Sequence, residues 1–192
     1  RYAESHKINA WIARQFIDKQ LREGLDLDLC DVGASTGGFI EALYMEYWQS
    51  FHMPLPGVSL YATDTSEHML CKINEKLPLV RTYEQDVCTM ASMGNMFDIV
   101  NVSYVLQFLK PPKVVTALRE IRQSMNKNGL LFVSQKEQID TGFADMFQDR
   151  YIDFRRQNGY SEDEIQAKTK ALKGSMFPYS SRMLVEMLES AG

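Results

Sequence analysis

A glycine-rich segment between a predicted strand and a predicted helix constrains the fold of this chain most strongly. The segment covers residues 31–38 and reads Asp-Val-Gly-Ala-Ser-Thr-Gly-Gly. Residues 25–32 lead into it with alternating leucine and aspartate, and an apolar helical stretch follows over residues 39–49. A strand, a tight glycine turn and a helix in this order are typical of the first unit of an open parallel sheet.

The alternation of strands and helices continues to about residue 134. We expect a first helix over residues 5–23, ahead of the strand at 25–32. Later segments are predicted as strands at 58–62, 79–83, 97–102 and 130–134, and as helices at 67–76 and from Pro111 to a turn at 126–129. The fold class predicted from this order is α/β, with a doubly wound, mostly parallel, Rossmann-like sheet.

After Ser134 the alternation stops and the chain reads as helices. An apolar stripe joins Phe143, Phe147, Tyr151 and Phe154, and residues 161–164 form a capping box. With 192 residues the chain falls in the range of one domain, so we expect residues 1–192 to form a single domain. The segment from about 135 to 192 is then expected to pack on or over the sheet, as a lid, a substrate-binding segment or a dimer segment.

Charge and residue usage exclude several classes of function. The net charge of -4 gives no global attraction for a polyanion, so a nucleic-acid partner would need a local basic patch. The three cysteines and three histidines have no spacing typical of metal ligands, so we expect no metal. No apolar run approaches the roughly 20 residues of a membrane span, and the unpaired cysteines favour a reducing, cytoplasmic location.

The glycine loop limits which ligand can bind at the carboxyl ends of the strands. In the dinucleotide motif G-x-G-x-x-G the middle glycine lets a pyrophosphate approach, but Ser35 carries a side chain at that position. No lysine follows Gly38, as a phosphate-binding P-loop would require. A nucleoside without a pyrophosphate fits better, because Asp64 would accept hydrogen bonds from two ribose hydroxyls. This pattern describes S-adenosylmethionine.

Three features that follow three successive strands resemble the class I methyltransferases. They are the glycine motif with Asp31, Gly33 and Gly37, the acid Asp64, and the acid Asp86. In that family the acid at the position of Asp86 reaches the adenine amino group. Each feature also has a purely structural explanation: a tight turn with positive φ at the glycines, a helix N-cap at Asp64, and a solvated carboxylate at Asp86.

Two longer tracts resemble more specifically the bacterial carboxy-S-adenosylmethionine-dependent tRNA uridine-34 transferases. They cover residues 105–111 and 153–162, and the likeness runs from Tyr2 to Gly192. It implies transfer of a carboxymethyl group to the oxygen of 5-hydroxyuridine at the tRNA wobble position, by a homodimer. It also implies a cofactor site formed by Tyr2, Gly33, Ala34, Ser35, Asp64, Thr65, Asp86, Val87 and Ser103, to which the glycine motif adds Asp31 and Gly37.

Four positions depart from the pattern of that family. Ala34 replaces a cysteine, Ser103 replaces an asparagine, and Gln135 replaces a glutamate. Thr169 stands where the family has the arginine that holds the extra carboxylate of its cofactor. A threonine supplies neither the charge nor the two hydrogen bonds of a guanidinium, so we expect plain S-adenosylmethionine as the donor. We also expect the antiparallel strands that close the general fold to be absent, since the sequence stops at Gly192 before them.

The sequence therefore predicts an enzyme that transfers a one-carbon group from S-adenosylmethionine to a nucleophile by in-line displacement. Candidate bases near the strand ends are Tyr104, Lys136 and Asp140. The acceptor is expected to be either a small molecule or tRNA, and a non-catalytic S-adenosylmethionine-binding protein stays open as an alternative. The tRNA hypothesis depends on basic residues of the helical tail with aromatic residues between them, namely Arg150, Arg155, Arg156, Lys168, Lys170 and Lys173.

Overall fold

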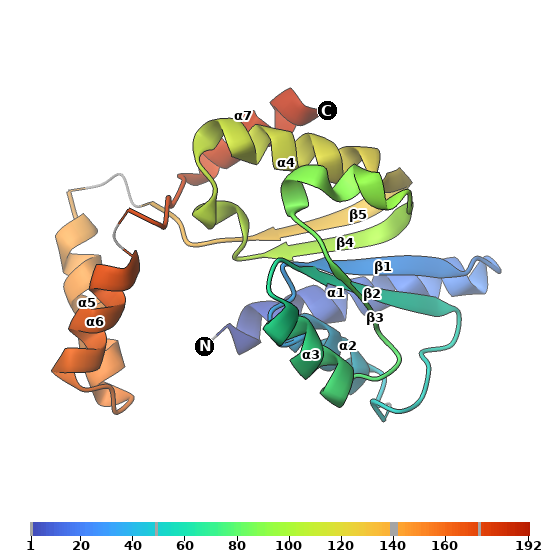
Figure 1. The fold of residues 1–192 in the computed structure, drawn as a ribbon, viewed down its shortest axis with the longest axis horizontal. Helices are drawn as coiled ribbons and strands as arrows, with labels where there is room; N and C mark the ends of the chain where they lie inside the picture. Colours follow the sequence, from blue (N-terminus) through green and yellow to red (C-terminus); the bar gives the residue numbers. More distant parts are fainter. Residues whose placement is uncertain (1, 49, 139–141, 173) are drawn as a thin grey trace.

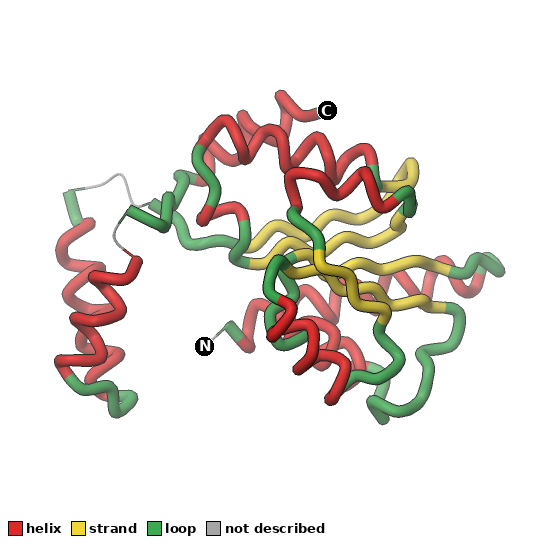
Figure 2. Tube along the Cα trace, viewed as in Figure 1, coloured by secondary structure: helices red, strands yellow, loops and turns green. Residues whose placement is uncertain are grey.

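A five-stranded sheet in the order β3-β2-β1-β4-β5 forms the centre of the molecule. The computed structural model describes residues 2–48, 50–138, 142–172 and 174–192. Each pair of neighbouring strands is parallel, and Figure 2 shows the strands as one twisted layer. The strands are β1 (Leu27–Val32), β2 (Val58–Asp64), β3 (Arg81–Glu84), β4 (Phe97–Ser103) and β5 (Met125–Ser134). The predicted α/β fold class is confirmed.

Helices cover both faces of this sheet, as Figure 1 shows. One face carries α1 (Ala3–Arg22), α2 (Gly38–Glu46) and α3 (Glu67–Lys76). The other carries α4 (Pro111–Gln123), α7 (Ser181–Ala191) and the 3-10 segment η1 (Val87–Met93). A short 3-10 turn, η2 (Leu106–Phe108), follows β4, and α5 (Ala144–Gln157) and α6 (Glu162–Leu172) lie between β5 and α7.

Two apolar clusters on opposite faces fix the position of the sheet. In β1, Leu27 and Leu29 pack with α1, α2 and α3, whereas Cys30 and Val32 pack with α4 and η1. The alternation of side chains along a strand causes this division. Burial of a large apolar side chain contributes about 1.5 to 3 kcal/mol. Apolar packing on both faces of the sheet therefore holds the carboxyl ends of the strands in fixed positions.

The start of β5 differs from the sequence prediction. The spacing assigned Met125 to the preceding helix and placed a turn at 126–129, but Met125 begins the strand and pairs with Phe97. The register shifts next to Phe97, and Asn128 adopts a φ of 66°. A bulge takes up the extra residues, and asparagine tolerates the left-handed backbone better than most residues. The turn prediction is therefore wrong, because the same residue types suit a bulge.

The C-terminal helices divide into two groups. α7 packs on α4, whereas α5 and α6 lie beside each other and stand away from the sheet, beyond the ends of β4 and β5 (Figure 1). We call residues 144–172, which contain α5 and α6, the helical arm. Phe147 and Phe154, from the predicted apolar stripe, expose 50% and 58% of their surface. The expectation that the tail packs over the sheet does not hold for the arm, because helical spacing identifies an apolar face but not what covers it.

The ends of the C-terminal helices follow the sequence signals. The Ser161 backbone N–H donates to Glu164 Oε2 at 2.8 Å, which forms the predicted capping box of α6. Ser180 Oγ accepts from the backbone N–H of Met183 at the start of α7. Such caps satisfy N–H groups that have no partner within the helix. Over the described ranges, no helix is both long and apolar enough to cross a membrane.

Candidate functional site

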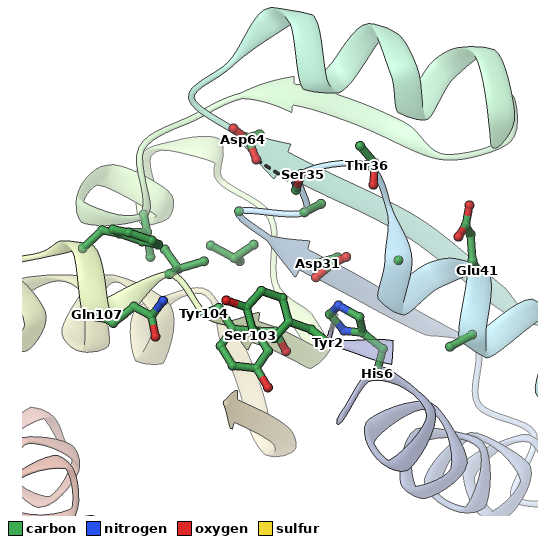
Figure 3. A pocket seen from close by; sticks show the side chains of 18 of the residues that line it. Tyr2, His6, Asp31, Ser35, Thr36, Glu41, Asp64, Ser103, Tyr104 and Gln107 are labelled. Atoms are coloured by element: carbon green, nitrogen blue, oxygen red, sulfur yellow. Dashed lines mark hydrogen bonds between the residues drawn. The ribbon is translucent and has the colours of Figure 1, made fainter. Parts of the chain in front are cut away.

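A cavity of about 920 Å³ opens at the carboxyl edge of the sheet (Figure 3). It lies where the strand order reverses between β1 and β4, the position at which open α/β sheets bind ligands. Its volume is in the range of small-molecule sites. The structure brings together here ten of the eleven residues predicted for the cofactor, namely Tyr2, Asp31, Gly33, Ala34, Ser35, Asp64, Thr65, Asp86, Val87 and Ser103.

Two glycines of the loop are required by its geometry. Gly33 has a φ of 63°, and a Cβ added there would lie 2.3 Å from Val105 Cγ2. Gly37 has a φ of 79°, and its Cβ would lie 2.8 Å from Leu77 Cδ1. Glycine is the residue that accepts both the left-handed backbone and the close approach. Gly33 lines the cavity, whereas Gly37 packs against Leu77 and is not among the described lining residues.

Asp64 closes β2 beside the glycine loop. Its Oδ2 accepts from the backbone N–H of Ser35 at 2.9 Å, and its Oδ1 accepts from the backbone N–H of Ser66 at 2.9 Å. Ser66, not Asp64, is the N-cap residue of α3. A carboxylate accepts about four hydrogen bonds, so two acceptor positions remain after these contacts. Asp64 is thus held in place and can still bind a pair of hydroxyl groups.

Asp86 combines a structural contact with a place in the cavity. It is the N-cap of η1, and its Oδ1 accepts from the backbone N–H of Cys88 at 2.8 Å. It also lines the cavity beyond the end of β3. The contact within η1 fixes the carboxyl group, so Asp86 is a helix N-cap as well as a solvated carboxylate. This structural role is compatible with a contact to the cofactor.

Within the described ranges no three His, Cys, Asp or Glu side chains gather as a possible metal site.

A buried polar network lies beneath the glycine loop. Asp31 is only 3% exposed, and its Oδ1 accepts from Asn101 Nδ2 at 2.7 Å. Asn101 Oδ1 in turn accepts from Asn9 Nδ2 and from Ser103 Oγ, each at 3.0 Å. Burial raises the pKa of Asp31 to about 7, the hydrogen bond from Asn101 opposes the rise, and the charge of Asp64 adds to it.

Asn9 and Asn101 are not among the site residues predicted from the sequence. A signal for Asn101 was present, because an asparagine within the apolar run of β4 must find hydrogen-bond partners once it is buried. No comparable signal marks Asn9, which contacts a strand about 90 residues further along the chain.

Replacing Asp31 by asparagine should flatten the pH dependence of stability. The unfolded carboxyl has a pKa near 3.8 and the folded one a pKa of about 7. The native state therefore binds more protons between these values, so the contribution of Asp31 to stability is present below pH 4 and is lost as the pH rises toward 7. Urea unfolding at pH 5 and at pH 7.5 should show wild type losing stability relative to Asp31→Asn, by up to about 1.4 kcal/mol per pH unit.

The titration of His6 cancels in this comparison, because both proteins contain it. Its pKa is lowered by burial, so its own contribution to stability changes in the opposite direction, being lost as the pH falls. A difference between wild type and Asp31→Asn that stays constant from pH 5 to pH 7.5 would contradict the assignment.

Tyr104 forms a wall of the cavity at the end of β4. Its φ of 63° is strained for a tyrosine. Its ring stacks on Tyr2 with 3.8 Å between centroids, and its hydroxyl donates to Ser5 Oγ at 2.9 Å. Ser5 Oγ donates to the backbone oxygen of Tyr2 at 2.8 Å. Tyr104 lines the cavity, so its side chain is not only packed within the hydrophobic core.

Lys136, the second candidate base, is not among the described lining residues. Its Nζ lies 5.9 Å from the centre of the Tyr151 ring, and its backbone N–H donates to Gln107 Oε1 at 2.9 Å. Gln107 is 1% exposed and lines the cavity. Asp140 lies outside the described residues. Of the candidate bases, the structure therefore places Tyr104 at the cavity.

Two of the six basic residues proposed for tRNA, Arg155 and Arg156, are engaged within the helical arm. Arg155 is 6% exposed, and its guanidinium lies 5.0 Å from the centre of the Tyr160 ring. Arg156 forms ion pairs with the two carboxylates of Asp153 and Glu162. These contacts reduce the charge that the arm presents to a polyanion. The side chains of Lys168 and Lys173 lie outside the described part of the chain.

Comparison with known proteins identifies the family. Residues 29–129 match the family model of a methyltransferase domain. The chain belongs to this methyltransferase domain family. The matched segment runs from β1 into β5 and contains the glycine loop, Asp64 and Asp86. The prediction of an S-adenosylmethionine-dependent methyltransferase domain is therefore confirmed at the level of family and fold.

Curated relatives carry the name carboxy-S-adenosyl-L-methionine synthase. One from Trichodesmium erythraeum is 33% identical over 169 residues, which are 85% of this chain and 64% of the relative. One from Helicobacter pylori is 29% identical over 184 residues, which are 92% of this chain and 73% of the relative. The chain thus spans less than two thirds of the first. The sequence resemblance pointed to transferases that use the carboxylated cofactor, whereas these relatives are named as its synthases.

Solved methyltransferase structures share the fold. The CurJ carbon methyltransferase superimposes with a TM-score of 0.68 at 16% identity, over 97% of this chain and 46% of that one. CalS10 from Micromonospora echinaspora, an amino pentose methyltransferase with S-adenosylmethionine bound, gives 0.53 at 22% identity over 68% of this chain and 50% of that one. These matches confirm the class I methyltransferase fold of the methyltransferase domain.

Proposed function

We propose that this methyltransferase domain binds S-adenosylmethionine in the cavity and transfers a one-carbon group from it to a nucleophile. The observation that supports this best is the position of Asp64. The carboxylate closes β2 at the edge of the cavity, backbone N–H groups hold both of its oxygens, and two acceptor positions remain for a ribose diol.

The order of the strands supports one direction for the bound cofactor. Along the carboxyl edge, Asp86 follows β3, Asp64 ends β2, Asp31 lies in β1, and Ser103 ends β4. Adenine at Asp86 and ribose at Asp64 would direct the amino-acid part over β1. The reacting carbon would then face the end of β4, where Tyr104 lines the cavity.

When bound, S-adenosylmethionine supplies a carbon whose bond to a cationic sulfur breaks as the lone pair of the acceptor attacks, which leaves S-adenosylhomocysteine. The protein positions the two reactants and excludes water, and these effects can supply much of the acceleration. The stacked rings of Tyr2 and Tyr104 form an apolar wall for this purpose. The Tyr104 hydroxyl donates to Ser5, so a lone pair of its oxygen can accept a hydrogen bond from an acceptor group.

Calorimetry with S-adenosylhomocysteine and NAD tests the proposal. We expect saturable binding of S-adenosylhomocysteine and no measurable binding of NAD, because the Ser35 side chain occupies the place where a pyrophosphate would approach. Comparable binding of NAD, or the absence of S-adenosylhomocysteine binding, would overturn the proposal. Turnover of S-adenosylmethionine with candidate acceptors then separates an enzyme from a non-catalytic binding protein.

A second candidate is chemistry of carboxy-S-adenosylmethionine, which the names of the relatives favour. Thr169, at the position of the expected arginine, donates its hydroxyl to the backbone oxygen of Ile165 within α6. The Thr169 hydroxyl is therefore engaged within its own helix, and it supplies no positive charge for the extra carboxylate, which counts against this candidate. Adding carboxy-S-adenosylmethionine to the same calorimetry decides between the donors, since tighter binding of the carboxylated form would favour this candidate.

A tRNA acceptor and a homodimer remain predictions. The helical arm and its start expose aromatic side chains that a second copy of the chain could cover, among them Phe143, Phe147 and Phe154. The engagement of Arg155 and Arg156 within the arm leaves a small-molecule acceptor better supported than tRNA.

A further inference from the structure

We infer that His6 binds the amino-acid end of the cofactor, by donating a hydrogen bond to its carboxylate. This inference depends on the proposed function and adds a binding residue from α1 to the acids of the strand ends. His6 is one of the three histidines, whose spacing does not indicate a metal site.

His6 lies on the part of the cavity wall where the amino-acid end is expected. It lines the cavity together with Asp31 and Ser35, and Figure 3 shows its ring on the α1 side of the cavity. Residues three apart in a helix share a face. Asn9, three residues after His6, contacts Asn101 of β4, so this face of α1 is turned toward the carboxyl edge of the sheet.

The His6 ring is held by packing on two sides. Its edge meets the ring of Tyr104 at 90°, with 6.5 Å between centroids. Its Cδ2 and Nε2 lie 3.2 and 3.4 Å from the position that a Cβ on Gly38 would take. Gly38 has no positive φ, so its backbone does not require a glycine. A glycine at this position instead leaves space for the His6 ring. The imidazole therefore packs in a defined position between α1, α2 and the end of β4.

The surroundings of the two ring nitrogens indicate which one carries the proton. Nδ1 is buried and has no hydrogen-bond partner among the described residues. An orphaned buried N–H is rarer and more costly than an orphaned acceptor, so we assign a lone pair to Nδ1 and the proton to Nε2. Burial also lowers the pKa of His6, which favours the neutral ring. The neutral ring then has its N–H donor at Nε2, on the edge next to Gly38.

The other charged groups of the cavity leave this donor for a carboxylate. The amino-acid end of the cofactor carries an ammonium and a carboxylate group. Asp31 is an acid and suits the ammonium. Glu41 is paired with Lys76, and Lys7 Nζ is paired with Glu4 at 2.8 Å. Among the residues that the structure describes, none accepts a hydrogen bond from His6 Nε2, so this donor suits the carboxylate.

Two nucleosides and three variants test the inference. S-Adenosylhomocysteine contains the amino-acid end, whereas 5′-deoxy-5′-methylthioadenosine lacks it. His6→Leu removes both ring nitrogens but still fills the space that the imidazole occupies. His6→Gln keeps a hydrogen-bond donor near the position of Nε2. His52→Leu makes the same change at an exposed histidine that is not among the lining residues. Isothermal titration calorimetry gives the dissociation constant of each pair.

We expect His6→Leu to weaken S-adenosylhomocysteine binding by about tenfold or more, as for a hydrogen bond to a charged group. Methylthioadenosine binding should stay within about twofold of wild type, since other contacts set it. His6→Gln should recover part of the loss, and His52→Leu should match wild type. Equal weakening of both nucleosides, or of neither, would overturn the assignment of His6 and leave the cofactor proposal standing. Wild type that binds neither nucleoside would overturn both.

Discussion

Asp64→Ala is expected to weaken binding of S-adenosylhomocysteine by about a hundredfold or more. The substitution removes the acceptor for two ribose hydroxyls, and hydrogen bonds to a charged group contribute about 1.5 to 3 kcal/mol each. It also removes the acceptor of the Ser35 and Ser66 backbone N–H groups, which position the glycine loop and the start of α3. Isothermal titration calorimetry measures the change directly.

Two further variants separate binding from folding. Glu75→Ala removes an exposed acid of the neighbouring helix α3 and should bind like wild type. Asp64→Asn keeps an acceptor oxygen and should lie between alanine and wild type. Affinity of Asp64→Ala within a few fold of wild type, in a protein with an unchanged unfolding transition, would show that the cofactor site lies elsewhere.

Gly33→Ala is expected to destabilise the protein by about 2 to 5 kcal/mol. A left-handed backbone costs a non-glycine residue about 1 to 2 kcal/mol. The added Cβ would also lie 2.3 Å from Val105 Cγ2, and overpacking of this kind costs about 1 to 3 kcal/mol. The stiff χ1 of valine limits relief by rotation. Urea unfolding monitored by circular dichroism measures the loss.

Matched substitutions divide this loss into its two causes. Gly94 has a φ of 70°, but no atom of the described residues lies within 4 Å of an added Cβ, so Gly94→Ala should lose only the backbone part, about 1 to 2 kcal/mol. Adding Val105→Ala to Gly33→Ala should relieve the overlap but not the backbone strain. If Gly33→Ala were no worse than Gly94→Ala, the close approach of Val105 would have no energetic weight.

The glycine loop shows how far local sequence can predict a site. Gly33, Ser35 and Asp64 are close in sequence to the strand ends that carry them, so strand prediction and spacing were sufficient to place them at one edge. Gly37 is predicted for the cofactor, and in the structure it lies against Leu77 and is not among the described lining residues, so its role toward the cofactor stays a prediction. The turn requires a glycine there for its backbone and for space, and this requirement has the same signature as ligand binding.

His6, Asn9 and Asn101 show where local sequence is insufficient. Their roles depend on α1 lying against the ends of β4 and β5, and the hydrogen bonds of Asn9 to these strands join residues 92 and 125 positions apart. No periodicity or motif encodes which face of α1 meets which strand. The burial that changes the pKa of Asp31 follows from the same packing.

Local sequence is sufficient to predict the α/β class, the glycine loop and the acids that end β2 and follow β3, because backbone preference and alternation act over a few residues. Packing across the whole chain places the helical arm away from the sheet, Tyr104 at the cavity, and the His6 ring beside Gly38. These outcomes depend on which apolar surfaces pair across the whole chain. That pairing is fixed by the sum of many weak contacts, which a local pattern does not contain.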